Sequence, residues 1–169
     1  PFRLFKHYIQ EGGVATPFIA HWPSAIEDKG QIRRQPAYVI DLMPTILDAA
    51  RAEYPSQYNG KSILPVEGIS IHDVMTKNDT LDRDVIYFEH EGNRGLRKGK
   101  WKLVSRGYED AGYFRKVDSL GRDQWRLYDL KSDRTETEDL SMDYPELKEE
   151  LIDSWYKWAK RTNTIPKPK

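Results

Sequence analysis

The chain has 169 residues, enough for one ordinary domain or for a small domain with part of another. It carries 27 lysines and arginines against 27 aspartates and glutamates, so nothing in its charge favours nucleic acid or an anionic membrane as a partner. Aromatic residues make up 12% and can supply a core, and no apolar run approaches the roughly 20 residues of a membrane span.

The first predicted element is a short apolar run behind a pair of glycines. Gly12 and Gly13 favour a tight turn with positive φ. Residues 14–20 contain the β-branched and aromatic residues of a short buried strand, and Pro23 ends it. Because Pro17 cannot donate a backbone hydrogen bond, this strand is expected either at the edge of a sheet or with a local irregularity.

A helix is predicted over residues 41–51, with Asp41 as its N-cap and Pro44 in its first turn. Its apolar residues form one stripe at helical spacing, which predicts packing against a sheet. Residues 52–70 read as a long irregular connection, followed by a helical turn at 71–76 and a subdomain boundary near residues 78–84.

The second half of the chain is rich in predicted strands, at residues 84–89, 93–97, 101–105 and 125–130. Residues 106–122 are expected to form a long excursion between two of them. A helix is predicted over residues 145–161, because Pro145 suits a first helical position and the apolar residues then recur on one face. That face carries Trp155 and Trp158, which we expect to pack against one side of an antiparallel sheet.

The order of several motifs resembles the C-terminal part of the type I sulfatases, arylsulfatase-like hydrolases of the alkaline phosphatase superfamily. Lys6 lies five positions before Glu11-Gly12-Gly13, and a Trp-Pro pair follows at residues 22–23. The resemblance continues in order through residues 41–48, 59–60, 67–70, 89–94, 97–103, 127–130, 133–136 and 139–140 and into the C-terminal helix. No single motif suffices, but the ordered set spans nearly the whole chain.

The resemblance implies an α+β chain of two parts. Residues 1–80 would be the end of an α/β sulfatase catalytic domain. Residues 81–169 would be a C-terminal α+β subdomain, a small antiparallel sheet of about four strands packed on a C-terminal helix. It implies hydrolysis of sulfate esters, of an aryl sulfate or a sulfated glycan, and a periplasmic or secreted location.

The family's nucleophile and metal are expected outside this chain. The resemblance implies a formylglycine made from Cys or Ser in a Cys/Ser-x-Pro-x-Arg motif, beside a calcium ion. This chain has no cysteine, and none of its serines begins such a motif. We therefore expect the calcium ligands and the nucleophile in a missing N-terminal region, no metal site in this chain, and no sulfatase activity of the chain alone.

Four residues are candidate site residues. The resemblance implies that Lys6 contacts the sulfate group, where its ammonium would neutralise a sulfate oxygen as the S–O bond breaks. His90, Asn93 and Arg94 lie in the segment that the resemblance places near the cleft mouth, where they would bind the leaving-group part of the substrate. The same segment also reads as a strand end with solvated charges, and a lone His-x-Glu pattern is a weak metal signal. His7 is expected to be a surface or packing residue.

Two other readings of the chain remain open. The basic residues at 94–102 could attract an anionic glycan, or they could be the solvated face of an antiparallel sheet. The carboxylates at residues 129–139 read as loop and turn residues and not as a calcium site. The alternatives to a sulfatase are a non-catalytic glycan-binding or docking module, and a phosphatase or phosphonate-ester hydrolase of the same superfamily.

Overall fold

The computed structural model describes residues 1–106 and 125–165. By their contacts, the residues form two compact units, and each is described here by itself. One unit combines residues 1–17 with residues 84–169, and the other consists of residues 18–83. The division into a catalytic part at 1–80 and a subdomain at 81–169 concerns a larger enzyme and stays a prediction.

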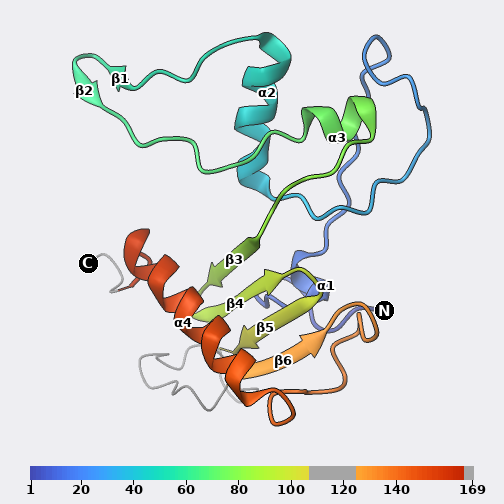
Figure 1. Cartoon of the computed structure of the whole chain (residues 1–169), viewed down its shortest axis with the longest axis vertical. Helices are drawn as coiled ribbons and strands as arrows, with labels where there is room; N and C mark the ends of the chain where they lie inside the picture. Colours follow the sequence, from blue (N-terminus) through green and yellow to red (C-terminus); the bar gives the residue numbers. More distant parts are fainter. Residues whose placement is uncertain (107–124, 166–169) are drawn as a thin grey trace. The chain divides into compact units, whose positions relative to one another are not determined.

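The first unit is built on a four-stranded antiparallel sheet, in agreement with the α+β class expected from the sequence (Figure 1). Its strands are β3 (Val85–His90), β4 (Asn93–Lys98), β5 (Trp101–Ser105) and β6 (Trp125–Asp129), and they lie in chain order. Gly99 turns the chain between β4 and β5 with a φ of 56°, a conformation that glycine adopts without strain. All four strands had been predicted, to within a residue or two at their ends.

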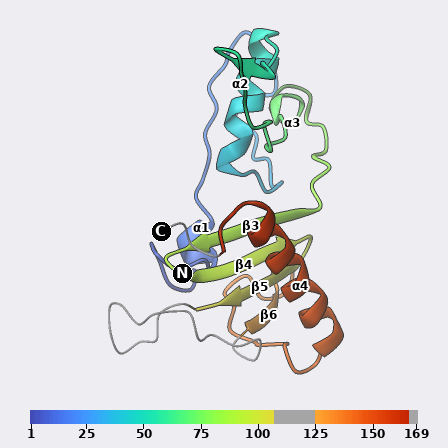
Figure 2. The ribbon, with the colours of Figure 1, turned by 90° about the vertical axis from the view of Figure 1, so that its left-hand side faces the viewer.

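One face of this sheet is covered by α4 (Pro145–Arg161), which begins and ends where the sequence predicts (Figure 2). Its buried residues meet the side chains that β4, β5 and β6 present on that face. The cluster contains Leu96, Leu103, Trp125, Leu127, Leu151, Ile152, Trp155 and Ala159, all of them fully buried or nearly so. Trp155 also donates a hydrogen bond from Nε1 to the carbonyl oxygen of Phe88, 2.9 Å away. Burial of its indole therefore leaves no polar atom unsatisfied.

The opposite face of the sheet is covered by the N-terminal segment, residues 1–17, which includes α1 (Glu11–Val14). Ile9 is 3% exposed and packs with Val104 and Tyr128. Lys102, one of the basic residues that could have marked a solvated face, is 0% exposed on this side. The solvated-face reading is wrong for Lys102, because a distant segment of the chain covers that face.

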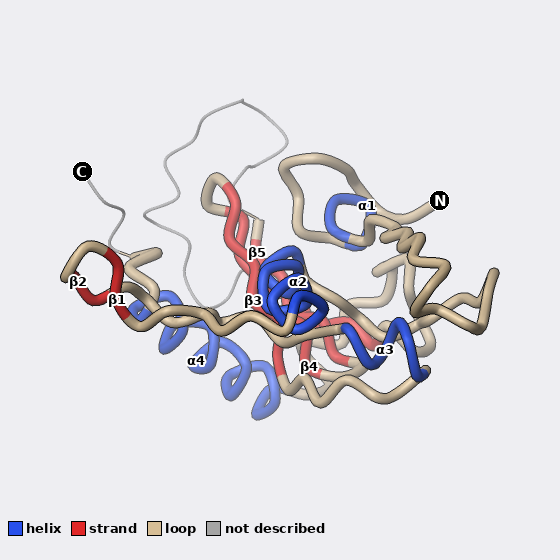
Figure 3. The backbone as a smooth tube through the Cα atoms, turned by 90° about the horizontal axis from the view of Figure 1, so that it is seen from above, coloured by secondary structure: helices blue, strands red, loops and turns tan. Residues whose placement is uncertain are grey.

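The second unit contains η1 (Val39–Asp41), α2 (Leu42–Ala50), α3 (His72–Lys77) and the short pair β1 (Gln57–Tyr58) and β2 (Lys61–Ser62) (Figure 3). The long connection expected at residues 52–70 is thus irregular apart from this pair. No helix in the described part of the chain is long and apolar enough to cross a membrane.

Asp41 organises the second unit. It is completely buried, and its carboxylate accepts hydrogen bonds from the backbone amides of Tyr38 and Ile69, at 2.7 and 3.0 Å. The same carboxylate pairs with Arg83. Asp41 does occupy the N-cap position of α2, but its side chain does not cap that helix. It ties the start of the helix to the end of the long connection instead.

The prediction of a strand over residues 14–20 is wrong. Residues 15–20 form no strand, and Phe18 and Ile19 are 55% and 88% exposed. The packing of the α2 stripe against a sheet stays a prediction, and within this structure Met43 and Ile46 are 52% and 63% exposed. The predicted excursion at residues 106–122 lies outside the described residues except for Arg106.

Candidate functional site: the Lys6 loop and its histidine cluster

Lys6 lies at the tip of a tight loop. Its side chain is exposed, and its backbone has a φ of 48°, which is uncommon for a residue other than glycine. The loop closes through a hydrogen bond from the amide of Tyr8 to the carbonyl of Phe5, 3.2 Å long. The amide of Gly12 closes a wider ring on the carbonyl of Arg3 at 3.0 Å. The ammonium of Lys6 therefore extends from a segment whose backbone is held at both ends.

Gly12 and Gly13 allow this loop to fold back on α1. A Cβ on Gly12 would lie 2.0 Å from the carbonyl oxygen of Leu4, and one on Gly13 would lie 1.8 Å from that of Tyr8. Real Cβ atoms do not approach backbone so closely, so only glycine fits at either position. The predicted reason for these glycines, a positive φ, is wrong, because neither has one. Both sit in the helical turn, and the constraint is space for the loop that carries Lys6.

Asn93, one of the predicted site residues, holds the middle of the loop. It is 1% exposed, and its side-chain amide donates a hydrogen bond to the carbonyl oxygen of His7 at 2.9 Å. Because His7 follows Lys6 directly, this bond fixes the backbone next to the lysine. In this structure, Asn93 is thus a buried residue that holds the loop in place through a hydrogen bond.

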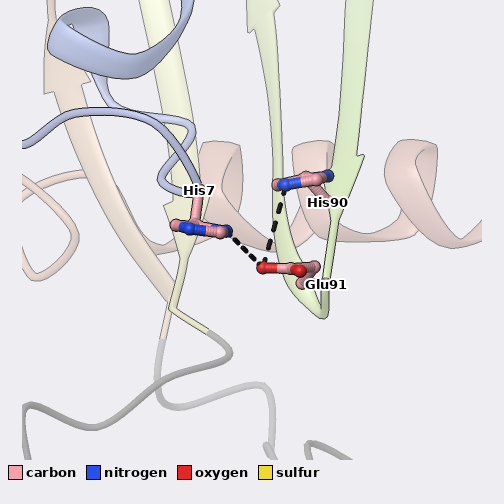
Figure 4. A group of neighbouring side chains, drawn as sticks. All are labelled: His7, His90 and Glu91. Carbon is pink, nitrogen blue, oxygen red and sulfur yellow. Dashed lines mark hydrogen bonds and ion pairs between the residues drawn. The ribbon is translucent and has the colours of Figure 1, made fainter. Parts of the chain in front are cut away.

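His7, His90 and Glu91 form a cluster beside the loop (Figure 4). Nδ1 of His7 lies 2.5 Å from Oε2 of Glu91, and Nε2 of His90 lies 3.8 Å from the same oxygen. The two imidazole rings are stacked, with centroids 5.6 Å apart and an interplanar angle of 18°. Glu91 and Gly92 form the two-residue turn between β3 and β4, both with positive φ, and this turn places the carboxylate beside both rings.

The cluster offers two kinds of chemistry. The imidazole nitrogens and the carboxylate offer hydrogen-bond donors and acceptors that could bind a sugar hydroxyl. The two ring nitrogens and the carboxylate oxygen also lie within 4.8 Å of one another, a set that suits zinc or a similar transition metal. It does not suit calcium, which prefers six or more oxygen ligands. Among the described residues no other close set of His, Asp or Glu side chains of this kind occurs.

Arg94 points to the other face of the sheet. Its Nη1 donates a hydrogen bond to the hydroxyl of Tyr156, 2.8 Å away, and its guanidinium lies over the rings of Trp125 and Trp155 at 5.2 and 5.6 Å. It is only 8% exposed. The structure therefore brings Lys6, His90 and Asn93 to one side of the sheet and places Arg94 on the side of α4.

A group of buried charges lies under the loop. Oε1 of Glu11 lies 3.3 Å from Nζ of Lys102, and Oε2 lies 3.4 Å from Nε of Arg134. The backbone amide of Glu11 donates a hydrogen bond to Oε2 of Glu136 at 2.7 Å. Arg3 in turn donates to the carbonyl of Glu136. We call Glu11, Lys102 and Glu136 the buried anchor, since all three are at most 3% exposed.

Burial changes the acidity of two members of the anchor. It raises the pKa of Glu136 from its ordinary value of 4.5 to about 6, although the hydrogen bond from the amide of Glu11 opposes the change. Oε1 of Glu136 is buried without a hydrogen-bond partner among the described residues. Burial also lowers the pKa of the Lys102 ammonium, against the attraction of Glu11 and Glu136.

Sequence reasoning did not identify three features of this site. His7 was expected to be a surface or packing residue, although it meets Glu91 across 84 positions of sequence. Glu91 was considered only as a carboxylate next to His90, and the buried anchor was not singled out. Glu11 had one available signal, its place within the Lys6–Gly13 motif. A charged residue next to two glycines in a tight backbone turn is a candidate for a buried ion pair, but its partner cannot be identified from the spacing of residues.

Comparison with known proteins decides the family. A family model described as N-sulphoglucosamine sulphohydrolase, C-terminal, matches residues 2–160. The chain belongs to this family. An "uncharacterized sulfatase" of Schizosaccharomyces pombe is 30% identical to it over 99% of this chain and 29% of that protein. The ulvan-active sulfatase of Formosa agariphila is 25% identical over 95% of this chain and 36% of that protein.

The likeness extends to solved structures. One, from work on the metabolism of multiple glycosaminoglycans by Bacteroides thetaiotaomicron, aligns with a TM-score of 0.68 at 22% identity, over 94% of this chain and 32% of that chain. It supports the sulfatase C-terminal fold of this chain. The chain spans about a third of the length of the first curated relatives that it matches. Those relatives are sulfatases, that is, sulfuric ester hydrolases.

Proposed function

We propose that this chain is the C-terminal part of an enzyme that hydrolyses sulfate esters of glycans, and that it contributes Lys6 as a sulfate contact. The family match over residues 2–160 carries the proposal. Two of the matched relatives are named N-acetylgalactosamine-6-sulfatase and N-acetylglucosamine-6-O-sulfatase, which favours a sulfated amino sugar as the substrate class. A periplasmic or secreted location belongs to the same proposal.

In the reaction the S–O bond of the ester breaks, a water molecule supplies oxygen to sulfur, and a proton goes to the departing sugar hydroxyl. The formylglycine nucleophile and the calcium ion would be supplied by residues that this chain lacks. Lys6 would bind a sulfate oxygen and stabilise the charge that develops there, since its exposed ammonium is a compact point charge. His90, 56% exposed on its side chain, would donate a hydrogen bond to the sugar.

The test is sulfate release by a full-length protein that carries this chain, with a sulfated amino sugar and the matching phosphate ester as substrates. Removing a positioned charge that acts on the developing anion costs about 10²- to 10³-fold in rate. We therefore expect Lys6→Ala to lower kcat/KM by that factor, and Lys131→Ala, which changes an exposed loop lysine, to leave it unchanged. An unchanged kcat/KM in Lys6→Ala, or a preference for the phosphate ester, would contradict the proposal.

The isolated chain should release no sulfate, because it contains neither a cysteine nor a Ser-x-Pro-x-Arg motif. Purified chain incubated with an aryl sulfate checks this directly. Turnover that follows the chain through successive purification steps would show that the nucleophile has been assigned wrongly.

A further inference from the structure

We propose that the buried anchor of Glu11, Lys102 and Glu136 positions Lys6 for its contact with sulfate. These three are positioning residues, since none of them reaches solvent where a substrate could bind. The inference rests on the proposed role of Lys6. It assigns a purpose to a group of buried charges that the reaction itself does not use.

The backbone connects the anchor to Lys6 directly. Glu11 begins α1, and the next residue, Gly12, closes the ring on Arg3 that contains the loop. The carbonyl of Leu4 touches Gly12, and that of Tyr8 touches Gly13, with no space left for a methyl group. A shift of the first turn of α1 must therefore move the loop carbonyls, and Lys6 lies between them.

The first turn of α1 is held through both the side chain and the backbone amide of Glu11. The carboxylate of Glu11 is held by Lys102 and Arg134, and its backbone amide is held by Glu136. Lys102 is itself held between Glu11 and the ring of Phe88, whose centroid lies 4.7 Å from Nζ. Lys102 and Phe88 belong to β5 and β3, so these contacts fix the position of the loop relative to the sheet.

Stability alone does not account for these charges. Replacing a buried ion pair by apolar residues of similar volume is often neutral or stabilising, so such a pair is weak evidence of a stabilising role. The loop, in contrast, needs to be held. Leu4 and Lys6 have φ values of 58° and 48°, and strained residues persist only where their surroundings fix them. Directional bonds to Glu11 fix the loop in a way that apolar packing would not.

The experiment is a double-mutant cycle on a full-length protein that carries this chain, with Glu11→Gln, Lys6→Ala and the double variant. A displacement of about 1 Å at a catalytic group can cost ~10²-fold. We expect Glu11→Gln to lower kcat/KM about 10- to 100-fold when Lys6 is present, and less than about threefold in the Lys6→Ala background. The control is Glu150→Gln, which removes the exposed pair with Lys98 and should change neither value.

The outcomes separate the two proposals. If Lys6→Ala lowers kcat/KM but the two changes are additive, Glu11 acts on general structure and the positioning role is wrong. If Lys6→Ala alone has no effect, the sulfate contact is wrong and the positioning role is overturned with it. Should Glu11→Gln fail to fold, the same cycle with Arg134→Gln decides, because that side chain is 55% exposed and contacts the same carboxylate.

Discussion

The face of the sheet under α4 is buried by aromatic rings, whereas the face under the N-terminal segment is buried around charges. On the first face, the buried cation Arg94 lies over Trp125 and Trp155. On the second face, Lys102 meets Glu11 within a group that also includes Glu136 and Arg134. The two faces are formed by alternate residues of the same strands.

This difference indicates that the two faces have different roles. The free energy gained from aromatic packing is roughly proportional to the apolar area that it buries. Such packing tolerates small shifts, so it suits the stabilisation of a fold. Hydrogen bonds and ion pairs depend on distance and angle, so they suit the fixing of a particular loop. The α4 face should accordingly dominate stability, and the N-terminal face should dominate the order of the segment that carries Lys6.

The largest expected effect comes from removing the centre of the α4 face. Trp155→Ala would leave a cavity in the cluster and free the carbonyl of Phe88, and such changes cost about 3–5 kcal/mol. Chemical denaturation of the chain, followed by tryptophan fluorescence and circular dichroism, measures the loss. Met142→Ala is the control, because this residue is 84% exposed and should change stability by less than about 0.5 kcal/mol. A loss near that of the control would place the stabilising core elsewhere.

A smaller loss is expected from Lys102→Met on the N-terminal face. Methionine keeps the volume but leaves the buried carboxylate of Glu11 with Arg134 alone, and breaking a buried pair costs about 3 kcal/mol. The double variant Lys102→Met, Glu11→Gln removes the uncompensated charge and should recover most of the loss in the same denaturation experiment. A double variant as unstable as the single one would show that the pair itself supports the fold, which would weaken the contrast between the faces.

The smallest effect is a dependence of stability on pH that is specific to the N-terminal face. Below pH 4.5 Glu136 is protonated in the folded and the unfolded chain, so its full contribution to the free energy of unfolding is present. Between pH 4.5 and about 6 the unfolded chain loses this proton first, and the folded state becomes relatively less stable as the pH rises. The difference of about 1.5 between the two pKa values corresponds to about 2 kcal/mol.

Glu136→Gln tests this dependence, because glutamine keeps an acceptor for the amide of Glu11 but does not titrate. The decline in the free energy of unfolding between pH 4.5 and 6 should shrink by roughly 2 kcal/mol in this variant. Glu53→Gln, at an exposed position of the other unit, should leave the decline as it is in the parent chain. Equal pH profiles for the parent chain and Glu136→Gln would mean that Glu136 is charged and paired when folded.

The parts of the fold that could be predicted are those determined by local pattern. The bounds of α4 follow from Pro145 and a stripe with a period of 3.6 residues, and β3 to β6 follow from alternation between turn residues. Residues 15–20 have the composition of a strand but form none, because a strand requires a partner. The composition of an apolar segment does not indicate whether a partner strand is available.

The candidate site could be predicted only in part, because it is assembled from distant segments. The motif pointed to Lys6, and the segment at 89–94 pointed to His90 and Asn93. The burial of Lys102 could not be predicted, since alternation in β5 shows which residues share a face but not what covers it. The meeting of His7 with Glu91 depends on the same N-terminal segment lying on that face.

Amide hydrogen exchange on the chain and its Glu11→Gln variant tests most directly whether the charged face orders the loop. The reporters are the amides of Tyr8, Gly12 and Gly13, which donate within the loop and its helical turn, and the amide of Leu127 in β6, which donates to the carboxylate of Asp139. The account predicts that Glu11→Gln accelerates exchange at the first three amides by roughly tenfold or more and leaves Leu127 unchanged. Equal acceleration at all four amides, or no change at any of them, would contradict it.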